Sequence, residues 1–200
     1  MPFGAVMAGN RNPQGDGEES LLRCARTVSE ILGPDSFPFI GGMALSAFGY
    51  VRGTLDADFI SGGEPMAMNA ALRNKGIESQ LTWGDPDVPL PWVIRGELGG
   101  VPFDILPQVA GTRVERGTFL PDLGITVCSV EDFIALKCFA GGGAQDLADI
   151  ANLIGIRPDI RTSALRVAGA YGLSERLLSF LAPPDPGGEG LTISSYGLIF

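Results

Sequence analysis

Two aspartates separated by one residue, Asp56 and Asp58, are the first side chains whose type and spacing could do chemistry. In a β-strand, residues two apart project from the same face, so both carboxylates would point to one side. Carboxylates held side by side repel each other, and a hard cation with oxygen ligands is the usual relief. The pair therefore indicates a metal site, although an Asp-x-Asp pair also occurs at solvated strand edges and in turns.

A third aspartate, Asp104, stands between Phe103 and Ile105 in an apolar, strand-like run. A carboxylate in such surroundings is costly unless it is paired, exposed or bound to metal. If its strand lies beside the one with Asp56 and Asp58, the three carboxylates form one cluster. If it does not, Asp104 is an ordinary exposed strand residue.

Gly41-Gly42 could supply an anion site beside such a cluster. Glycines at a strand-to-helix turn let backbone amides approach an anion closely, and the start of a helix adds favourable polarity. Tight turns use the same pair constantly, so Gly-Gly by itself is not specific.

The elements that must position these residues follow from the hydrophobic periodicity. We expect helices at 18–32, 43–50, 65–75, 130–139, 146–154 and 162–181, and strands at 37–40, 55–61, 78–83, 92–98, 101–106 and within 124–129. Gly99-Gly100 predicts a two-residue hairpin, and Leu55 is expected to pack in the core with Ala57 and Phe59.

These elements predict an α/β (α+β) fold with a mixed central sheet flanked by helices and a helical C-terminal part. The expected division is a flexible leader (1–17), a catalytic core (18–129), a helical C-terminal part (130–182) and a tail (183–200).

Composition excludes several function classes. The chain of 200 residues has no histidine, so no Ser-His-Asp or Cys-His arrangement and no histidine-based metal centre can be built. Its three cysteines lack CxxC spacing and are expected to be reduced, buried residues. A formal charge of −9 argues against an extended duplex nucleic acid as partner, but not against a metal-chelated polyphosphate. With no basic signal segment and no sufficiently long apolar run, we expect a soluble cytoplasmic protein with no membrane contact.

In combination, the motifs resemble a known family. The order is Gly41-Gly42-Met43-Ala44, then Gly49, Arg52, Thr54, Asp56 and Asp58, with Asp104 on a later strand. This order resembles the DNA polymerase beta-like nucleotidyltransferase superfamily, and most closely its minimal and AbiEii-type members. Two downstream helical segments, 131–137 and 145–150, resemble those of the same family, so the similarity spans about residues 37–154.

The resemblance implies a polymerase beta-like fold and a role for each motif residue. Asp56, Asp58 and Asp104 would be catalytic and hold two Mg²⁺ ions, and the backbone of Gly41 and Gly42 would contact the phosphates of a nucleoside triphosphate (NTP). Further nucleotide-binding residues would be Arg52, Thr54 and Lys137. For Arg52 the alternative is a surface ion pair, for Thr54 a strand-forming residue, and for Lys137 a lysine that reaches the surface.

The implied function is Mg²⁺-dependent transfer of a nucleoside monophosphate from an NTP such as ATP to an acceptor hydroxyl on a small molecule, a protein or an RNA end. Relatives occur in toxin–antitoxin and phage-defence modules, so a cognate partner protein is a further expectation. The alternative is a non-catalytic nucleotide-binding or antitoxin-like interaction module on the same fold. A weaker alternative is a metal-dependent phosphohydrolase.

Overall fold

A seven-stranded mixed sheet forms the centre of the computed structural model, which describes residues 15–33, 39–50, 53–84, 90–108, 114, 117–140 and 143–182. The strands are β1 (Phe39–Ile40), β2 (Ala57–Ser61), β3 (Glu78–Trp83), β4 (Trp92–Leu98), β5 (Val101–Pro107), β6 (Gly117–Leu120) and β7 (Ile125–Cys128). Their order across the sheet is β3-β4-β5-β2-β1-β7-β6. The β2–β5 and β1–β7 pairs are parallel and the other neighbours are antiparallel.

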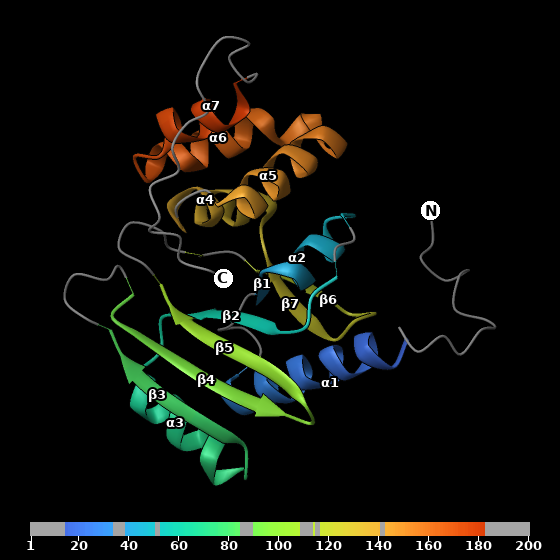
Figure 1. The fold of residues 1–200 in the computed structure, drawn as a ribbon, viewed down its shortest axis with the longest axis vertical. Coiled ribbons are helices and arrows are strands. Elements are labelled where there is room, and N and C mark those ends of the chain that lie inside the picture. The colour runs from blue at the N-terminus through green and yellow to red at the C-terminus, as the bar shows by residue number, and fades with distance from the viewer. Residues whose placement is uncertain are drawn as a thin grey trace.

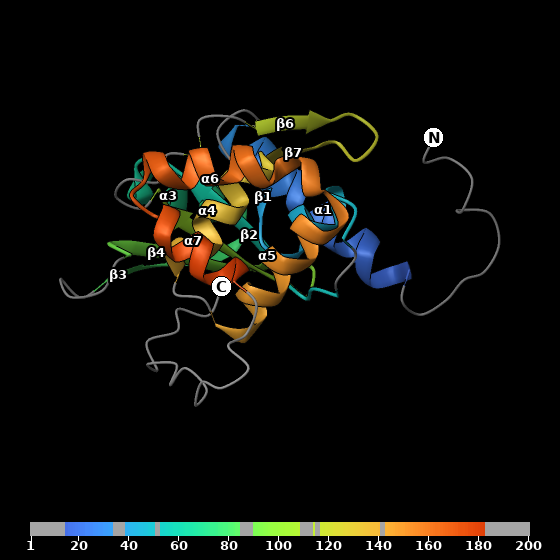
Figure 2. The ribbon, with the colours of Figure 1, turned by 90° about the horizontal axis from the view of Figure 1, so that it is seen from above.

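Helices cover the sheet unevenly. They are α1 (Gly15–Leu32), α2 (Gly42–Ala47), α3 (Pro65–Asn74), α4 (Val130–Ala140), α5 (Ala144–Ile156), a 3₁₀ turn η1 (Pro158–Ile160), α6 (Arg161–Ala170) and α7 (Ser174–Leu181). Helices α1 and α3 lie against one face, whereas α4 to α7 gather at the opposite end of the molecule (Figure 1). Seen from above, α4 to α7 lie over the sheet (Figure 2).

Strand alternation divides the core in two. Ala57 and Phe59 of β2 are buried in a cluster with residues of α1 and α3, such as Leu72. Ile60, which points to the other face, is buried in a second cluster with Phe133 of α4. Because β2 is buried on both faces, it is a fixed central element on which a site can be built.

The β4–β5 hairpin turns at Gly99-Gly100, as the sequence predicts. Both glycines have positive φ, 63° and 81°, which a two-residue turn of the primed type requires and which other residues rarely adopt. Leu98 lies opposite Val101, and this register fixes every pair further along the two strands.

The expected α/β class is confirmed: a mixed central sheet is flanked by helices and followed by a helical C-terminal part. Two details differ from expectation. Strand β6 was not foreseen, since its four residues carry no alternation long enough to detect. The single helix expected at 162–181 is two helices, because Gly172 has φ 72° and the Leu173 amide donates to the Ala168 carbonyl at 2.7 Å, which caps α6.

Other expectations concern the chain ends and the thiols. Residues 1–14 and 183–200, which include most of the expected leader and the whole tail, lie outside the described residues. Cys24, Cys128 and Cys138 are buried and free, as expected. Burial raises the pKa of the Cys24 thiol to about 11, so it is protonated at neutral pH. Within the described segments, no helix is long and apolar enough to cross a membrane.

Candidate active site

A glycine turn separates β1 from α2. Gly41 has φ 83°, a left-handed conformation that favours glycine. A Cβ added at Gly41 would collide with the Asp58 carboxylate, and one added at Gly42 would collide with Thr54. The turn is therefore built from glycine for two reasons, backbone conformation and the space that Asp58 and Thr54 occupy.

Asp58 and Asp104 lie directly opposite each other on the parallel strands β2 and β5. Neighbouring strands are about 4.8 Å apart, and directly paired residues share a face of the sheet. The same row continues to Arg95 on β4, which is the register partner of Asp104. We call Asp58, Asp104 and Arg95 the charged row. The sequence did not determine whether Asp58 and Asp104 lie close together, whereas the pairing of β2 with β5 makes them neighbours.

Asp56 does not lie within the strand, where the sequence predicted it. Strand β2 begins at Ala57, so Asp56 stands in a bend just before the strand rather than within it. The Thr54 hydroxyl donates to Asp56 Oδ1 at 2.7 Å, which fixes the carboxylate. The core position expected for Leu55 is wrong: its side chain is 86% exposed, because alternation between two faces does not extend upstream of the strand.

The electrostatics of Asp104 connect it with Asp56 and Arg95. Burial is the largest influence on the pKa of Asp104 and raises it above its usual range, although the Arg95 charge and hydrogen bond each lower it. The negative charge of Asp56 adds a smaller upward contribution to the same pKa. Asp56 is therefore close enough to influence Asp104, although Thr54 rather than Asp104 is its hydrogen-bonding partner.

A divalent cation would find suitable donors in the three carboxylates. Carboxylate oxygens are what Mg²⁺ prefers, and Gly41 leaves free the space into which Asp58 projects. However, among the residues that the structure describes, no group of three or more acidic or cysteine side chains is arranged to hold a metal ion. Asp104 accepts a hydrogen bond from Arg95 Nε at 3.3 Å. The residue types fit a cation, while the three-carboxylate site stays a prediction.

Lys137 belongs to a second, buried group of charges. Its Nζ donates to Asp146 Oδ1 at 2.7 Å and lies 3.6 Å from Asp149 Oδ2. The amide of Gln145 donates to Asp149 Oδ1 at 3.0 Å. The Lys137 side chain is 5% exposed and that of Asp149 is fully buried. We call Lys137, Asp146 and Asp149 the buried triad.

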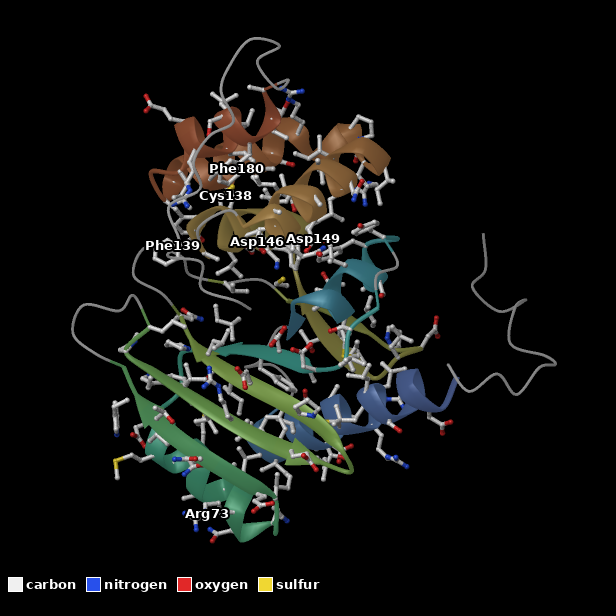
Figure 3. All side chains as sticks on the ribbon, viewed as in Figure 1. Arg73, Cys138, Phe139, Asp146, Asp149 and Phe180 are labelled. Carbon is white, nitrogen blue, oxygen red and sulfur yellow. The ribbon has the colours of Figure 1, made fainter. Side chains whose placement is uncertain are left out.

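The buried triad connects helices α4 and α5. Ser129 caps the start of helix α4: its Oγ accepts from the Asp132 amide at 3.1 Å and donates to the Asp132 carboxylate at 2.8 Å. Asp146 and Asp149, three residues apart, share one face of α5, which Figure 3 shows turned toward the rest of the molecule. Lys137 is thus engaged by two carboxylates rather than reaching the surface.

Arg52 lies outside the described residues, so its expected contact with phosphate is untested. Arg95 was not foreseen, yet a signal was present. A two-residue Gly99-Gly100 turn pairs residues whose numbers sum to 199, and this places Arg95 opposite Asp104.

Comparison with known proteins gives matches in structure alone. No protein-family model matches the chain, and no curated protein matches its sequence at a significant level. A provisionally assigned nucleotidyltransferase from H. pylori aligns with 16% identity over 84% of this chain and 81% of its own, with a TM-score of 0.48. ANT(2'')-Ia, solved with adenylyl-2''-tobramycin, aligns with 12% identity over 82% and 97%, with a TM-score of 0.44. The Megavirus polyadenylate synthase aligns with 11% identity over 86% of this chain and 35% of its own, with a TM-score of 0.45. With TM-scores below 0.5, these likenesses assign neither a family nor an activity.

Proposed function

We propose that the chain is a nucleotidyltransferase of the polymerase beta-like superfamily, which transfers a nucleoside monophosphate from an NTP to an acceptor hydroxyl and releases pyrophosphate. The observation that supports it best is the position of Asp58, which faces the Gly41 turn on one side and pairs in register with Asp104 on the other. Such a site offers carboxylates for a metal-chelated triphosphate and backbone amides for its phosphates.

In this proposal the chain's own residues bind and orient the substrate. Asp56, Asp58 and Asp104 would hold Mg²⁺, which when bound neutralises phosphate charge and stabilises the attacking and leaving oxygens. The amides of the Gly41-Gly42 turn would contact phosphate oxygens. Helix α2 has only six residues, so the turn itself, more than helix polarity, would supply this contact.

Thr54 acts in the proposal as a positioning residue. Its hydroxyl is engaged with Asp56, and its side chain fills the space above Gly42. It therefore fixes the carboxylate at the start of β2 and braces the turn. A direct contact of Thr54 with nucleotide is not needed to explain its place in the motif.

The bond changes are those of an in-line displacement. The acceptor oxygen attacks the α-phosphorus, the bond to the bridging oxygen breaks, and pyrophosphate leaves. Asp104 is the carboxylate best placed to receive the acceptor proton, since it is the half-exposed member of the charged row and Asp58 is buried.

Finer parts of the proposal rest on sequence resemblance. They are the kinship with AbiEii-type proteins, the contact of Arg52 with phosphate and a cognate partner protein from a toxin–antitoxin or phage-defence module. The proposed cytoplasmic location rests instead on the cysteine usage and on the absence of a signal-like segment in the sequence. For Lys137, the buried partners Asp146 and Asp149 favour a structural role over a contact with nucleotide phosphates.

A non-catalytic nucleotide-binding or interaction module on the same fold is the second candidate. The observation that favours it is that Asp104 is engaged by Arg95 and that no three-carboxylate metal group is assembled in the described part of the chain. Such a module would bind NTP without turnover.

The deciding experiment measures pyrophosphate release and label transfer. Each of the four NTPs, labelled at the α-phosphate, is incubated with the protein, Mg²⁺ and a panel of hydroxyl acceptors, with EDTA in a parallel set. We expect Mg²⁺-dependent transfer that falls on the order of a thousandfold, about 4 kcal/mol, in Asp58→Asn. Asp159→Asn, an exposed aspartate on the remote turn η1, is the control and should keep full activity. NTP binding without pyrophosphate release across the panel would favour the non-catalytic module, and equal activity in Asp58→Asn would remove Asp58 from the mechanism.

A further inference from the structure

The ion pair of Arg95 and Asp104 lies within the charged row. Arg95 Nε donates to Asp104 Oδ2 at 3.3 Å, and the two residues are direct partners across β4 and β5. On its other side Asp104 is the direct partner of Asp58 on β2. One carboxylate of the proposed cation site is therefore already paired with a cation that the sheet itself supplies.

The backbone register fixes Arg95 opposite Asp104, but both side chains are partly exposed. The Gly99-Gly100 turn sets the register, and Gly96 holds β4 close to its neighbours, because an added Cβ there would collide with the Phe103 ring and the Glu78 carbonyl. The Arg95 side chain is nevertheless 69% exposed and that of Asp104 is 34% exposed. A pair exposed to this extent is weak, and its arginine can turn into water while the Asp104 side chain remains partly in contact with solvent.

We propose that Arg95 is a resident counter-ion of Asp104 that a divalent cation must displace, so that Arg95 sets the cation concentration at which the charged row is loaded. This inference rests on the proposed function, because it assumes that the carboxylates hold a cation. Without a divalent cation, Arg95 stabilises the Asp104 carboxylate against the nearby negative charge of Asp56. With one present, guanidinium and metal compete for the same Asp104 oxygens and also repel each other.

The charges of the row are also distributed unevenly across the sheet. β2 and β5 contribute the negative members, and β4 contributes the positive one at the side of the row away from the Gly41 turn. An arginine released from Asp104 remains tethered beside the site. The competition is therefore local and reversible.

The test measures metal binding directly and does not depend on activity. Free Mn²⁺ is followed by electron paramagnetic resonance during titration of the full-length protein at constant ionic strength. We compare the wild type with Arg95→Gln and, as a matched control, Arg157→Gln. Arg157 is also an exposed arginine paired with an aspartate, Asp159 at 3.0 Å, but it lies in the helical part. Both substitutions remove one positive charge, so the control corrects for the change in net charge.

We expect Arg95→Gln to lower the Kd for Mn²⁺ about twofold to fivefold, the range that loss of an exposed competing ion pair allows. Arg157→Gln should leave the Kd unchanged, and Arg95→Lys, which keeps the charge, should stay near the wild type. In an Asp104→Asn background, Arg95→Gln should have no further effect, because the pair through which it acts is gone.

The outcomes separate two failures. If the wild type binds Mn²⁺ and Asp58→Asn abolishes this binding, the cation site stands; an Arg95→Gln Kd that is unchanged or higher then overturns the role of Arg95 alone. If the wild type binds no Mn²⁺, the cation site and the role of Arg95 both fail. Circular dichroism of each variant confirms that the exposed substitutions leave the fold intact.

Discussion

Two groups of charged side chains use the same chemistry in different surroundings. In the charged row, Arg95 and Asp104 are partly exposed on the sheet, with Asp58 beside them. In the buried triad, Lys137 of helix α4 is enclosed by Asp146 and Asp149 of helix α5. A buried ion pair cannot part without leaving an unpaired charge in the core, whereas an exposed pair can exchange its partner for another ion.

Exposure, more than residue type, separates a structural ion pair from one that can take part in binding. The sequence singled out Lys137 for nucleotide and did not single out Arg95. The structure favours Arg95 over Lys137 for a role at the site, because Arg95 contacts the proposed metal ligand Asp104, whereas the partners of Lys137 are Asp146 and Asp149. Substitutions in each group of charges test whether the two groups have these different roles.

Replacing the buried lysine gives the largest expected effect on stability. Lys137→Met keeps the apolar stem but leaves the carboxylates of Asp146 and Asp149 without their cation, so the free energy of unfolding should fall by about 3 kcal/mol. Urea denaturation measures this loss. The chain's other lysine, the exposed Lys75, provides the control variant Lys75→Met, which should change stability little. If Lys137→Met is as stable as the control but binds NTP weakly, the buried triad belongs to the nucleotide site after all.

A methyl group at the glycine turn should disturb the charged row. In Gly41→Ala the new Cβ collides with the Asp58 carboxylate, so we expect transfer activity to fall about a hundredfold from misplacement of that group. The control is Gly49→Ala, which has φ 93° but open space around the new Cβ. Both variants carry the backbone strain, and only Gly41→Ala should lose activity beyond its loss of stability. Equal activity in the two variants would mean that strain rather than the position of Asp58 matters.

Thr54→Val tests how firmly Asp56 must be held. The variant keeps the shape that packs on Gly42 but loses the 2.7 Å hydrogen bond to Asp56, so we expect a decrease of about fivefold to tenfold in kcat/KM, close to 1 kcal/mol. Thr82→Val, an exposed threonine on β3, should be neutral. Steady-state kinetics at saturating Mg²⁺ distinguishes the two. A neutral Thr54→Val would show that Asp56 needs no support from this hydroxyl.

The smallest effect is expected from the pH dependence of stability. Because the folded pKa of Asp104 is raised, mainly by burial, its charged form costs more in the folded chain than in the unfolded chain. Asp104→Asn removes this cost, so above the folded pKa the variant should be more stable than the wild type by less than about 1 kcal/mol. The gain should disappear as the pH falls through the folded pKa toward the unfolded value, below which both states are protonated.

Asp159→Asn is the contrasting control for this pH series. The hydrogen bond from Arg157 lowers the pKa of Asp159, so its charge favours the folded state above the unfolded pKa, and this contribution is lost as the pH falls through the lowered folded pKa. Thermal denaturation is measured between pH 3 and 8, at roughly unit steps around the usual aspartate range. The difference in Tm between variant and wild type should rise with pH for Asp104→Asn and fall with pH for Asp159→Asn. If the Tm difference changed with pH in the same direction for both variants, the raised pKa of Asp104 would be contradicted.

Much of the architecture could be predicted from local patterns. The Gly99-Gly100 hairpin, the α3 segment and the strands β3 to β5 were expected because turn chemistry and hydrophobic period are properties of short segments. The helix break at Gly172 was missed, since a glycine inside a periodic run is read as tolerated. Leu55 was misplaced because the alternation of β2 was extended beyond the first residue of the strand.

By itself the sequence determined the inventory: no histidine, the candidate aspartates Asp56, Asp58 and Asp104, a Gly-Gly turn and two lysines, which restrict the chemistry to carboxylates, backbone amides and cationic side chains. Only the tertiary structure decided which of these residues meet. The pairing of β2 with β5 makes Asp58 and Asp104 neighbours, the hairpin register adds Arg95, and the packing of α4 on α5 buries Lys137. The reason is physical. Strand register and helix packing join residues far apart in the chain, and the free energy that selects these contacts comes from burial of the whole core rather than from any local motif.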